Sequence, residues 1–337
     1  MLLCAAAFCL GLLLASPAEI GGLPAKASAE TAAAPTVGIE ASAAQPDEPL
    51  AEALSPWPRS FDERFHLPVL TDEGLVSMSL HRYVLGAVLG EMPVDFAPEA
   101  RKAQAVACRT YALRQYTRRK HDSAAVCTQP GCCMRWVDPD DFAAEHGQAA
   151  FDAAEEAVRQ TDGLAIYYQD QLIEATFFSS SGGRTESAAA VWGGDLPYLQ
   201  SVESPDEHSP YDEAVVTVPE SEFSEILQAA NEMAVFPENG SWIGQIVRTD
   251  GGGVDTAELG GCIYTGPQLR RLFGLRSTLF TLLRHDGVVD FTTRGYGHRV
   301  GMSQYGAEAM AQKGSSFTEI LQWYYRGAEV CDVTRNS

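Results

Sequence analysis

The chain has 337 residues, a hydrophobic content of 45% and a formal net charge of −21. So acidic a chain is a poor partner for nucleic acid, because binding phosphates requires a basic face. The part beyond the N-terminal region is long and apolar enough to bury a sizeable core, in one large domain or two fused lobes.

The N-terminal region predicts export followed by a tether. Residues 2–15 form an apolar run, and residues 16–18, Ser-Pro-Ala, fit a small-residue cleavage site. We therefore expect residues 1–18 to be a signal peptide or a membrane anchor. Residues 19–58 are rich in Ala, Pro, Glu and Ser without periodicity, which predicts a disordered tether. The folded domain is then expected at residues 59–337.

The corner of a predicted helical hairpin presents one acid, Glu91. Apolar residues recur at helical spacing before it, and Pro93 forbids the helix to continue. Pro98 then opens a second helix in the way that first turns prefer. The corner places the carboxylate of Glu91 beside the basic residues Arg101 and Lys102. This arrangement suits acid/base chemistry, although most helix-end acids are solvated surface residues.

Four soft metal donors follow the second helix within a short stretch: His121, Cys127, Cys132 and Cys133. Thiolates with an imidazole suit tetrahedral zinc, and the Pro-Gly turn at 130–131 can fold both ends of the stretch onto one ion. A disulfide such as Cys127 with Cys132, or a set of free thiols, would account for the same residues.

The remaining chain alternates between helical and strand patterns, which predicts an α+β fold of mixed helices and antiparallel strands. A β-hairpin is expected from residues 164–168 and 172–178, and it runs into the SSSGG segment at 179–183. That segment would let a polar ligand approach closely, or it is a flexible turn. Residues 251–261 are expected to form a loop. Further helices are expected at 149–160, 219–231, 267–273, 304–312 and 317–325, and further strands at 243–249, 278–283 and 288–293.

Two segments resemble the sporulation protein D family of bacterial cell-wall proteins, which includes lytic transglycosylases and amidase enhancers. The first is EMP at 91–93 with PEARKAQAVACRTYA at 98–112, and the second is GYGHRVGMSQYGA at 295–307. The resemblance implies one large domain of that family, built as one body or as two lobes around a cleft. It also implies that Glu91 is the catalytic acid/base. In the second segment Arg299 stands where many relatives have glycine, which leaves open whether a positive φ is needed there.

The expected substrate contacts are polar and aromatic side chains in these two segments, in the SSSGG segment, and in the stretch AAAVWGGDLPYL at 188–199, which also resembles the family. Hydroxyls and glycines bring the chain close to a ligand, aromatic rings stack on sugar faces unless they are core, and a glycine-rich turn can fix an imidazole and an amide. The predicted substrate-binding residues are Lys102, Arg109, Tyr111, Ser180, Ser181, Trp192, Tyr198, His298, Gln304 and Tyr305.

The resemblance also favours zinc at the cysteine stretch, since some members of the family bind it there. His121, Cys127 and Cys133 match the family positions, whereas Cys132 replaces the usual His. A thiolate in place of an imidazole makes the ion less electrophilic, so one structural zinc per chain is expected, not a catalytic one.

The resemblance implies a lytic transglycosylase that cleaves the bond between N-acetylmuramic acid and N-acetylglucosamine without water. One carboxyl suffices, because the muramic acid's own C6 hydroxyl is the nucleophile and leaves a 1,6-anhydro end. Glu91 would protonate the leaving oxygen and then accept the C6 hydroxyl proton. A partly apolar setting from Leu89, Met92 and Phe96 should raise its pKa towards ~6.

Three rival functions are considered. An amidase enhancer would bind glycan and stimulate another enzyme without cleaving the glycan itself. A zinc hydrolase would use His121 and the cysteines, which the thiolate-rich donor set disfavours. A water-using glycosidase would need a second carboxylate, for which the first candidates are Glu174, Glu186 and Asp195.

The resemblance further implies where the protein acts and with what. The expected partners are peptidoglycan glycan strands, a cell-wall amidase (sporulation protein P) and a membrane scaffold (sporulation protein M). The expected place is outside the cytoplasm, anchored or secreted at the cell wall, where the septum is remodelled during engulfment.

Overall fold

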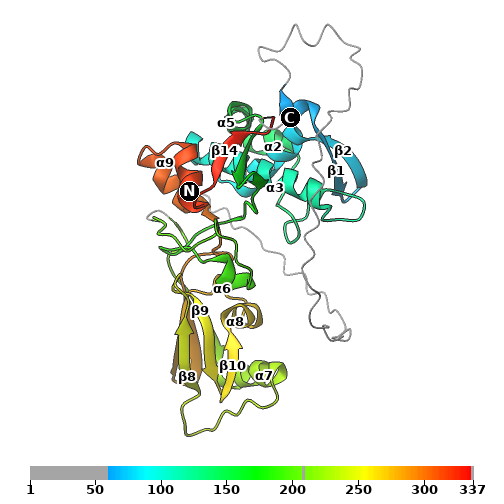
Figure 1. Ribbon diagram of the computed structural model, residues 1–337. Coiled ribbons are helices and arrows are strands. Elements are labelled where there is room, and N and C mark those ends of the chain that lie inside the picture. The colour runs from blue at the N-terminus through cyan, green and yellow to red at the C-terminus, as the bar shows by residue number, and fades with distance from the viewer. Residues whose placement is uncertain (1–59, 207–208, 335–337) are drawn as a thin grey trace, which may run out of the picture. The chain divides into compact units, whose positions relative to one another are not determined.

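The computed structural model describes residues 60–206 and 209–334, all within the unit Ala41–Ser337 (Figure 1). The predicted export segment at 1–18 and the tether at 19–58 lie outside the described residues. In the described part of the chain, no helix has the length and apolarity needed to cross a membrane. The fold is α+β, as predicted.

The described residues form helices and short strands in alternation. The helices are α1 (Phe61–Arg64), α2 (Leu80–Glu91), α3 (Pro98–Arg118), α4 (Pro139–His146), α5 (Gln148–Gln160), α6 (Ala188–Trp192), α7 (Glu220–Ala230), α8 (Gly266–Leu272), α9 (Gln304–Gln312) and α10 (Phe317–Tyr324). The strands are β1 (His66–Thr71), β2 (Gly74–Ser79), β3 (Val126–Cys127), β4 (Leu164–Tyr168), β5 (Gln171–Leu172), β6 (Phe177–Phe178), β7 (Ala214–Pro219), β8 (Ile243–Arg248), β9 (Val254–Leu259), β10 (Cys262–Thr265), β11 (Phe280–His285), β12 (Val288–Thr293), β13 (Met302–Ser303) and β14 (Glu329–Asp332).

Helix α3 is the centre of the helical part of the fold. Its small side chains face two hydrophobic cores, with Ala105 and Cys108 in the core shared with α2, and Ala103 and Val106 in the core shared with α9 and α10. Small residues let neighbouring elements approach closely, so α2, α5 and β4 all pack against α3 (Figure 1). Helix α3 is therefore buried against both cores.

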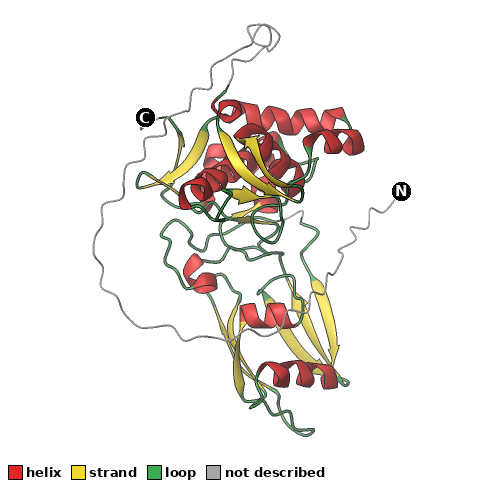
Figure 2. Ribbon diagram, turned by 90° about the vertical axis from the view of Figure 1, so that its right-hand side faces the viewer, coloured by secondary structure: helices red, strands yellow, loops and turns green. Residues whose placement is uncertain are grey.

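Residues 214–293 build a third core of their own. Two antiparallel sheets, ordered β10-β9-β8 and β11-β12-β7, are accompanied by α7 and α8 (Figure 2). Phe223 is fully buried there and packs its ring against those of Trp242, Phe273 and Phe291. Aromatic stacking of this kind adds stability beyond the buried area.

The prediction of a loop at residues 251–261 is wrong, because β9 is the middle strand of its sheet. Val254, Ala257 and Leu259 are buried in this strand while Asp255 is exposed. Glycines on either side of the strand and acidic residues within it obscure this alternation in the sequence. Pairing with the neighbouring strands β8 and β10 makes the segment a buried strand.

The predicted hairpin at 164–178 is only half present. Strand β4 pairs with β5 through Tyr167 and Tyr168, but the chain then leaves that sheet. Phe177 and Phe178 pair instead, in parallel, with β13. This change of partner brings the SSSGG segment beside the GYGHRVGMSQYGA segment, where Ser180 and Tyr296 form a bridge.

Candidate active site

The predicted turn between the two helices is confirmed, and Glu91 is the last residue of α2. The positive charge that acts on its carboxyl is that of Arg135, not of Arg101 or Lys102 as predicted. Met92 caps the helix with extended backbone, and Pro98 occupies the first turn of α3 as expected. The N–H of Ala97 donates to Glu308 Oε2 at 2.6 Å, which ties the start of α3 to helix α9. Helix α9 therefore helps to fix the corner that presents Glu91.

The carboxyl group of Glu91 lies in a partly apolar setting. Met92 and Phe96 are each 6% exposed, and Leu89 is buried as well. Burial raises the pKa of Glu91 above its ordinary value, and a hydrogen bond from the backbone N–H of Arg135 to Oε1, 2.6 Å long, opposes that rise. A raised pKa keeps more of the acid form near neutral pH, which suits a general acid.

Gln304 and Tyr305, both predicted substrate contacts, lie beside the corner. The side-chain amide of Gln304 donates to the backbone carbonyl of Glu91 at 3.2 Å and to Gln104 Oε1 at 3.5 Å. The ring of Tyr305 packs edge-on against Phe96, with centroids 5.1 Å apart. Residues far apart in the sequence thus meet at the corner where α2 ends.

An aromatic row continues from this corner, and sequence reasoning missed two of its members. Tyr211 packs against Tyr305 with centroids 5.8 Å apart, and Tyr296 packs against Tyr211 at 4.9 Å. The guanidinium of Arg276 lies over the Tyr211 ring at 5.4 Å. A polar hollow adjoins the row, lined by Gly182, Gly183, Asp206, Asp212, Glu213 and Arg294. Rings beside polar groups are the side chains that sugars contact. The one sequence signal for Tyr296 was its place between Gly295 and Gly297 in the second resembling segment.

His298 is held as a neutral imidazole. Its Nδ1 accepts the N–H of Val300 at 3.1 Å, and its ring packs against Trp192 and Phe178. Burial, together with the positive charge of Arg270, lowers the pKa of His298 to about 4. Trp192 remains 47% exposed, so it keeps a ring surface that a ligand could contact.

Arg109 is not a substrate contact, contrary to the prediction. Its side chain is fully buried, and its Nε donates to Asp62 Oδ2 at 2.7 Å. Its guanidinium also donates to the backbone carbonyls of Val158 and Leu164. Arg109 therefore joins α3 to α1, α5 and β4 inside the core, where no substrate can reach it.

Ser180, Ser181 and Tyr198 are likewise buried and were wrongly assigned to substrate. Both serine hydroxyls donate to Asp206 Oδ2 at 2.8 Å, and the N–H of Gly182 donates to the same oxygen at 2.9 Å. Tyr198 is 6% exposed and accepts the N–H of Glu174 at 2.9 Å. The SSSGG segment is thus a fixed turn around a buried carboxylate.

Lys102 and Tyr111 have partners away from the Glu91 carboxyl. Lys102 pairs with Glu99 at 2.7 Å on the same helix. The Tyr111 hydroxyl accepts a hydrogen bond from Lys120 at 2.9 Å, beside the cysteine stretch. Both are partly exposed, and their contact with substrate stays a prediction.

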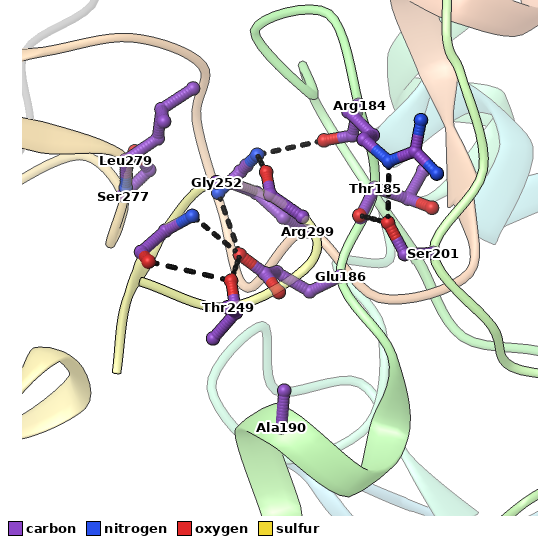
Figure 3. A network of polar contacts seen from close by, with 12 residues as sticks. Arg184, Thr185, Glu186, Ala190, Ser201, Thr249, Gly252, Ser277, Leu279 and Arg299 are labelled. Carbon is purple, nitrogen blue, oxygen red and sulfur yellow. Dashed lines mark hydrogen bonds and ion pairs between the residues drawn. The ribbon is translucent and has the colours of Figure 1, made fainter. Parts of the chain in front are cut away.

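Arg299 adopts a left-handed conformation, with φ at 65°, so the position does require a positive φ. Its guanidinium is fully buried and donates to Glu186 Oε1 at 3.1 Å (Figure 3). It also donates to the carbonyls of Ser181, Arg184 and Gly251. The hydroxyl of Thr249 reaches the same Glu186 oxygen at 2.8 Å. This network joins the SSSGG turn to the β8–β9 connection.

The three carboxylates considered as a second catalytic group have other surroundings. Glu186 is 1% exposed within the Arg299 ion pair. Glu174 is paired with Arg114 at 2.8 Å. Asp195 is exposed. None of these arrangements places a carboxylate against Glu91.

The predicted metal ligands do converge. One ligand atom from each of His121, Cys127, Cys132 and Cys133 lies within 4.8 Å of all the others. The cysteines of the described chain are free thiols, without the alternative bridge between Cys127 and Cys132. Burial alone would raise the pKa of Cys133, but hydrogen bonds from His121 and from the N–H of Cys127 lower it to about 7. Three thiols and one imidazole at this spacing fit tetrahedral zinc.

Comparison with known proteins agrees with these motifs. The model of a family described as stage II sporulation protein matches residues 73–168. Stage II sporulation protein D of Bacillus amyloliquefaciens is 37% identical over 272 residues, 78% of this chain and 77% of the relative. The protein of the same name from Bacillus subtilis (strain 168) is 35% identical over 274 residues, with the same shares. The amidase enhancer of Bacillus subtilis (strain 168) is 26% identical over 294 residues, 72% of this chain and 39% of that relative. The chain therefore belongs to the stage II sporulation protein D family.

Proposed function

We propose that this protein is a peptidoglycan lytic transglycosylase in which Glu91 is the single acid/base. The observation that supports it is one partly buried carboxyl group, with a raised pKa, at a fixed corner between two core helices. The aromatic row of Tyr305, Tyr211 and Tyr296 gives a sugar chain a surface next to that carboxyl.

The proposed reaction uses Glu91 twice. Its acid form donates a proton to the glycosidic oxygen, and the bond between that oxygen and C1 of muramic acid breaks. The Glu91 carboxylate then takes the proton of the C6 hydroxyl as the C6 oxygen bonds to C1. The ring closure yields a 1,6-anhydro end and returns Glu91 to its acid form, with no water consumed. Gln304 holds the Glu91 backbone in place during both steps.

Product analysis tests the proposal directly. We expect digestion of purified glycan strands to give 1,6-anhydromuramic ends, because the substrate's own hydroxyl closes the ring. A hydrolase would leave reducing ends heavier by one water, which mass spectrometry separates. Reducing ends would contradict the proposal and would demand a water-activating second carboxylate, which inverting and retaining glycosidases both require.

The similarity to an amidase enhancer supports a second candidate, a glycan-binding module without cleavage activity of its own. Such a module would yield no new glycan ends alone. With a cell-wall amidase added, it would release peptides and leave the glycan strands at their original length. The same mass spectra therefore separate the two candidates.

We further propose that His121, Cys127, Cys132 and Cys133 hold one structural zinc ion. Bound there, the ion would crosslink the stretch after α3 to β3 and so contribute folding energy. The four donors would complete its coordination, so it would offer no open position for catalysis.

Metal analysis of purified variants tests the zinc site. We expect equimolar zinc in the wild-type protein and in Cys132→His, which restores the donor that relatives usually have. Cys133→Ser should lose the metal and unfold at a lower temperature, because it removes one of the four ligands of the tetrahedral site. Cys262→Ser, outside the cluster, is the matched control and should keep both. Metal-free wild-type protein with a native Cys127–Cys132 bridge would refute the site.

The proposed setting is the cell wall during sporulation. Glycan strands are the proposed substrate, and an amidase and a membrane scaffold, sporulation proteins P and M, are the proposed partners. The two relatives named as sporulation proteins support the process, and the amidase enhancer supports interplay with an amidase. Export of the chain by its N-terminal segment belongs to the same proposal.

A further inference from the structure

The segment that follows the cysteine stretch crosses α2 at very short range. A Cβ atom on Gly86 would lie 2.1 Å from Trp136 Nε1, and one on Gly90 would lie 2.5 Å from the carbonyl oxygen of Arg135. The N–H of Val137 donates to the carbonyl of Gly86 at 3.2 Å. Two glycines on one face of α2 thus make the close approach possible.

The close approach aims one backbone donor at the proposed catalytic group. The N–H of Arg135 meets Glu91 Oε1 at 2.6 Å, the length of a strong, charge-assisted hydrogen bond. Among the described residues, Glu91 Oε2 makes no hydrogen bond, so it is free to exchange a proton. Met134, just before Arg135, is 2% exposed in the core of α2 and anchors the segment.

We infer that the backbone N–H of Arg135 is a positioning group for Glu91, and that the His121–Cys133 cluster anchors the segment that carries it. Cys133 lies two residues before Arg135, so movement of the cluster moves the donor. The inference rests on the proposed function of Glu91, because positioning matters only if that carboxyl reacts. It adds a role for the cluster that a purely structural zinc site does not have.

The hydrogen bond has two physical consequences. It fixes which carboxyl oxygen faces substrate, and it stabilises the charged form, which returns after the first proton transfer. The guanidinium of Arg135 also lowers the pKa of Glu91. The negative charge of Glu91 in turn helps to raise the pKa of the buried Cys108 thiol on α3. A test must therefore separate the amide of Arg135 from its side-chain charge.

Arg135→Pro and Arg135→Ala make that separation, because both remove the guanidinium and only proline removes the N–H. Residues 134–138 belong to no helix or strand, so proline at 135 breaks no helix or sheet hydrogen bond. The Glu91 pKa is followed by NMR of carbon-labelled glutamate side chains, with the Glu91→Gln spectrum for assignment. We expect the pKa to be higher in Arg135→Pro than in Arg135→Ala by about one unit. We also expect kcat to be lower by about tenfold, with KM unchanged.

A second variant guards against misfolding of the proline form. Gly90→Ala places a methyl group against the Arg135 carbonyl and pushes it away, so it should raise the Glu91 pKa as Arg135→Pro does. Removing metal with a chelator should raise it in the wild type and leave it unchanged in Arg135→Pro, where the donor is already gone. Equal pKa values and equal kcat in Arg135→Pro and Arg135→Ala would overturn the inference. Full activity of Glu91→Gln would instead overturn the proposed function while leaving the pKa pattern intact.

Discussion

Glu91→Gln is expected to abolish glycan cleavage while leaving the unfolding midpoint unchanged. The amide oxygen of glutamine can still accept the N–H of Arg135, so the corner keeps its shape. The amide cannot donate a proton to the glycosidic oxygen or retrieve one from the C6 hydroxyl. Loss of general acid/base action typically costs ~10² to 10⁴ in rate. Soluble fragments released from purified glycan strands measure the effect.

Asp95→Asn is the matched control for this variant. Asp95 is an exposed acid on the same corner, four residues after Glu91, and its substitution by asparagine removes one negative charge. We expect its turnover to stay within about threefold of wild type, as for most surface changes. If Glu91→Gln retains the turnover of Asp95→Asn, Glu91 has no part in the reaction.

Local sequence signals were sufficient to predict the corner itself. Helix α2 ends at Glu91 and α3 begins at Pro98, because proline and helical periodicity act within a few residues. The same signals predicted α9 with the bounds that the structure shows. The convergence of His121 with the cysteines was also predictable, since a short stretch with a turn brings its own ends together.

Contacts between distant residues were not predictable in this way. Arg109 lies in a motif rich in polar residues, and only Asp62, 47 positions away, shows why it is buried. The same holds for Ser180 and Ser181, whose partner is Asp206. A charge or hydroxyl in a recognisable motif looks the same in sequence whether it faces substrate or another buried group. Arg135 was missed because its contribution is a backbone N–H, which every residue but proline carries.

Arg299→Gly is expected to lower the free energy of unfolding by about 3–5 kcal/mol, although the family resemblance implies glycine at this position. Glycine accepts the positive φ at no steric cost. The loss comes from Glu186, whose carboxylate is 1% exposed and would stay buried without its cation. Three backbone carbonyls would lose their donor as well. Urea unfolding followed by circular dichroism measures the change.

Two companions show whether the buried ion pair is the cause. Glu186→Gln added to Arg299→Gly removes the uncompensated charge, and its amide oxygen can still accept from Thr249 and Gly253, so part of the stability should return. Arg294→Ala removes an exposed arginine five residues away and should change stability by less than about 0.5 kcal/mol. Hydrogen exchange should rise at residues 249–253 in Arg299→Gly alone, because Arg299 holds that connection through the Gly251 carbonyl. If the double variant is no more stable than Arg299→Gly, the lost carbonyl contacts rather than the unpaired Glu186 carboxylate explain the destabilisation.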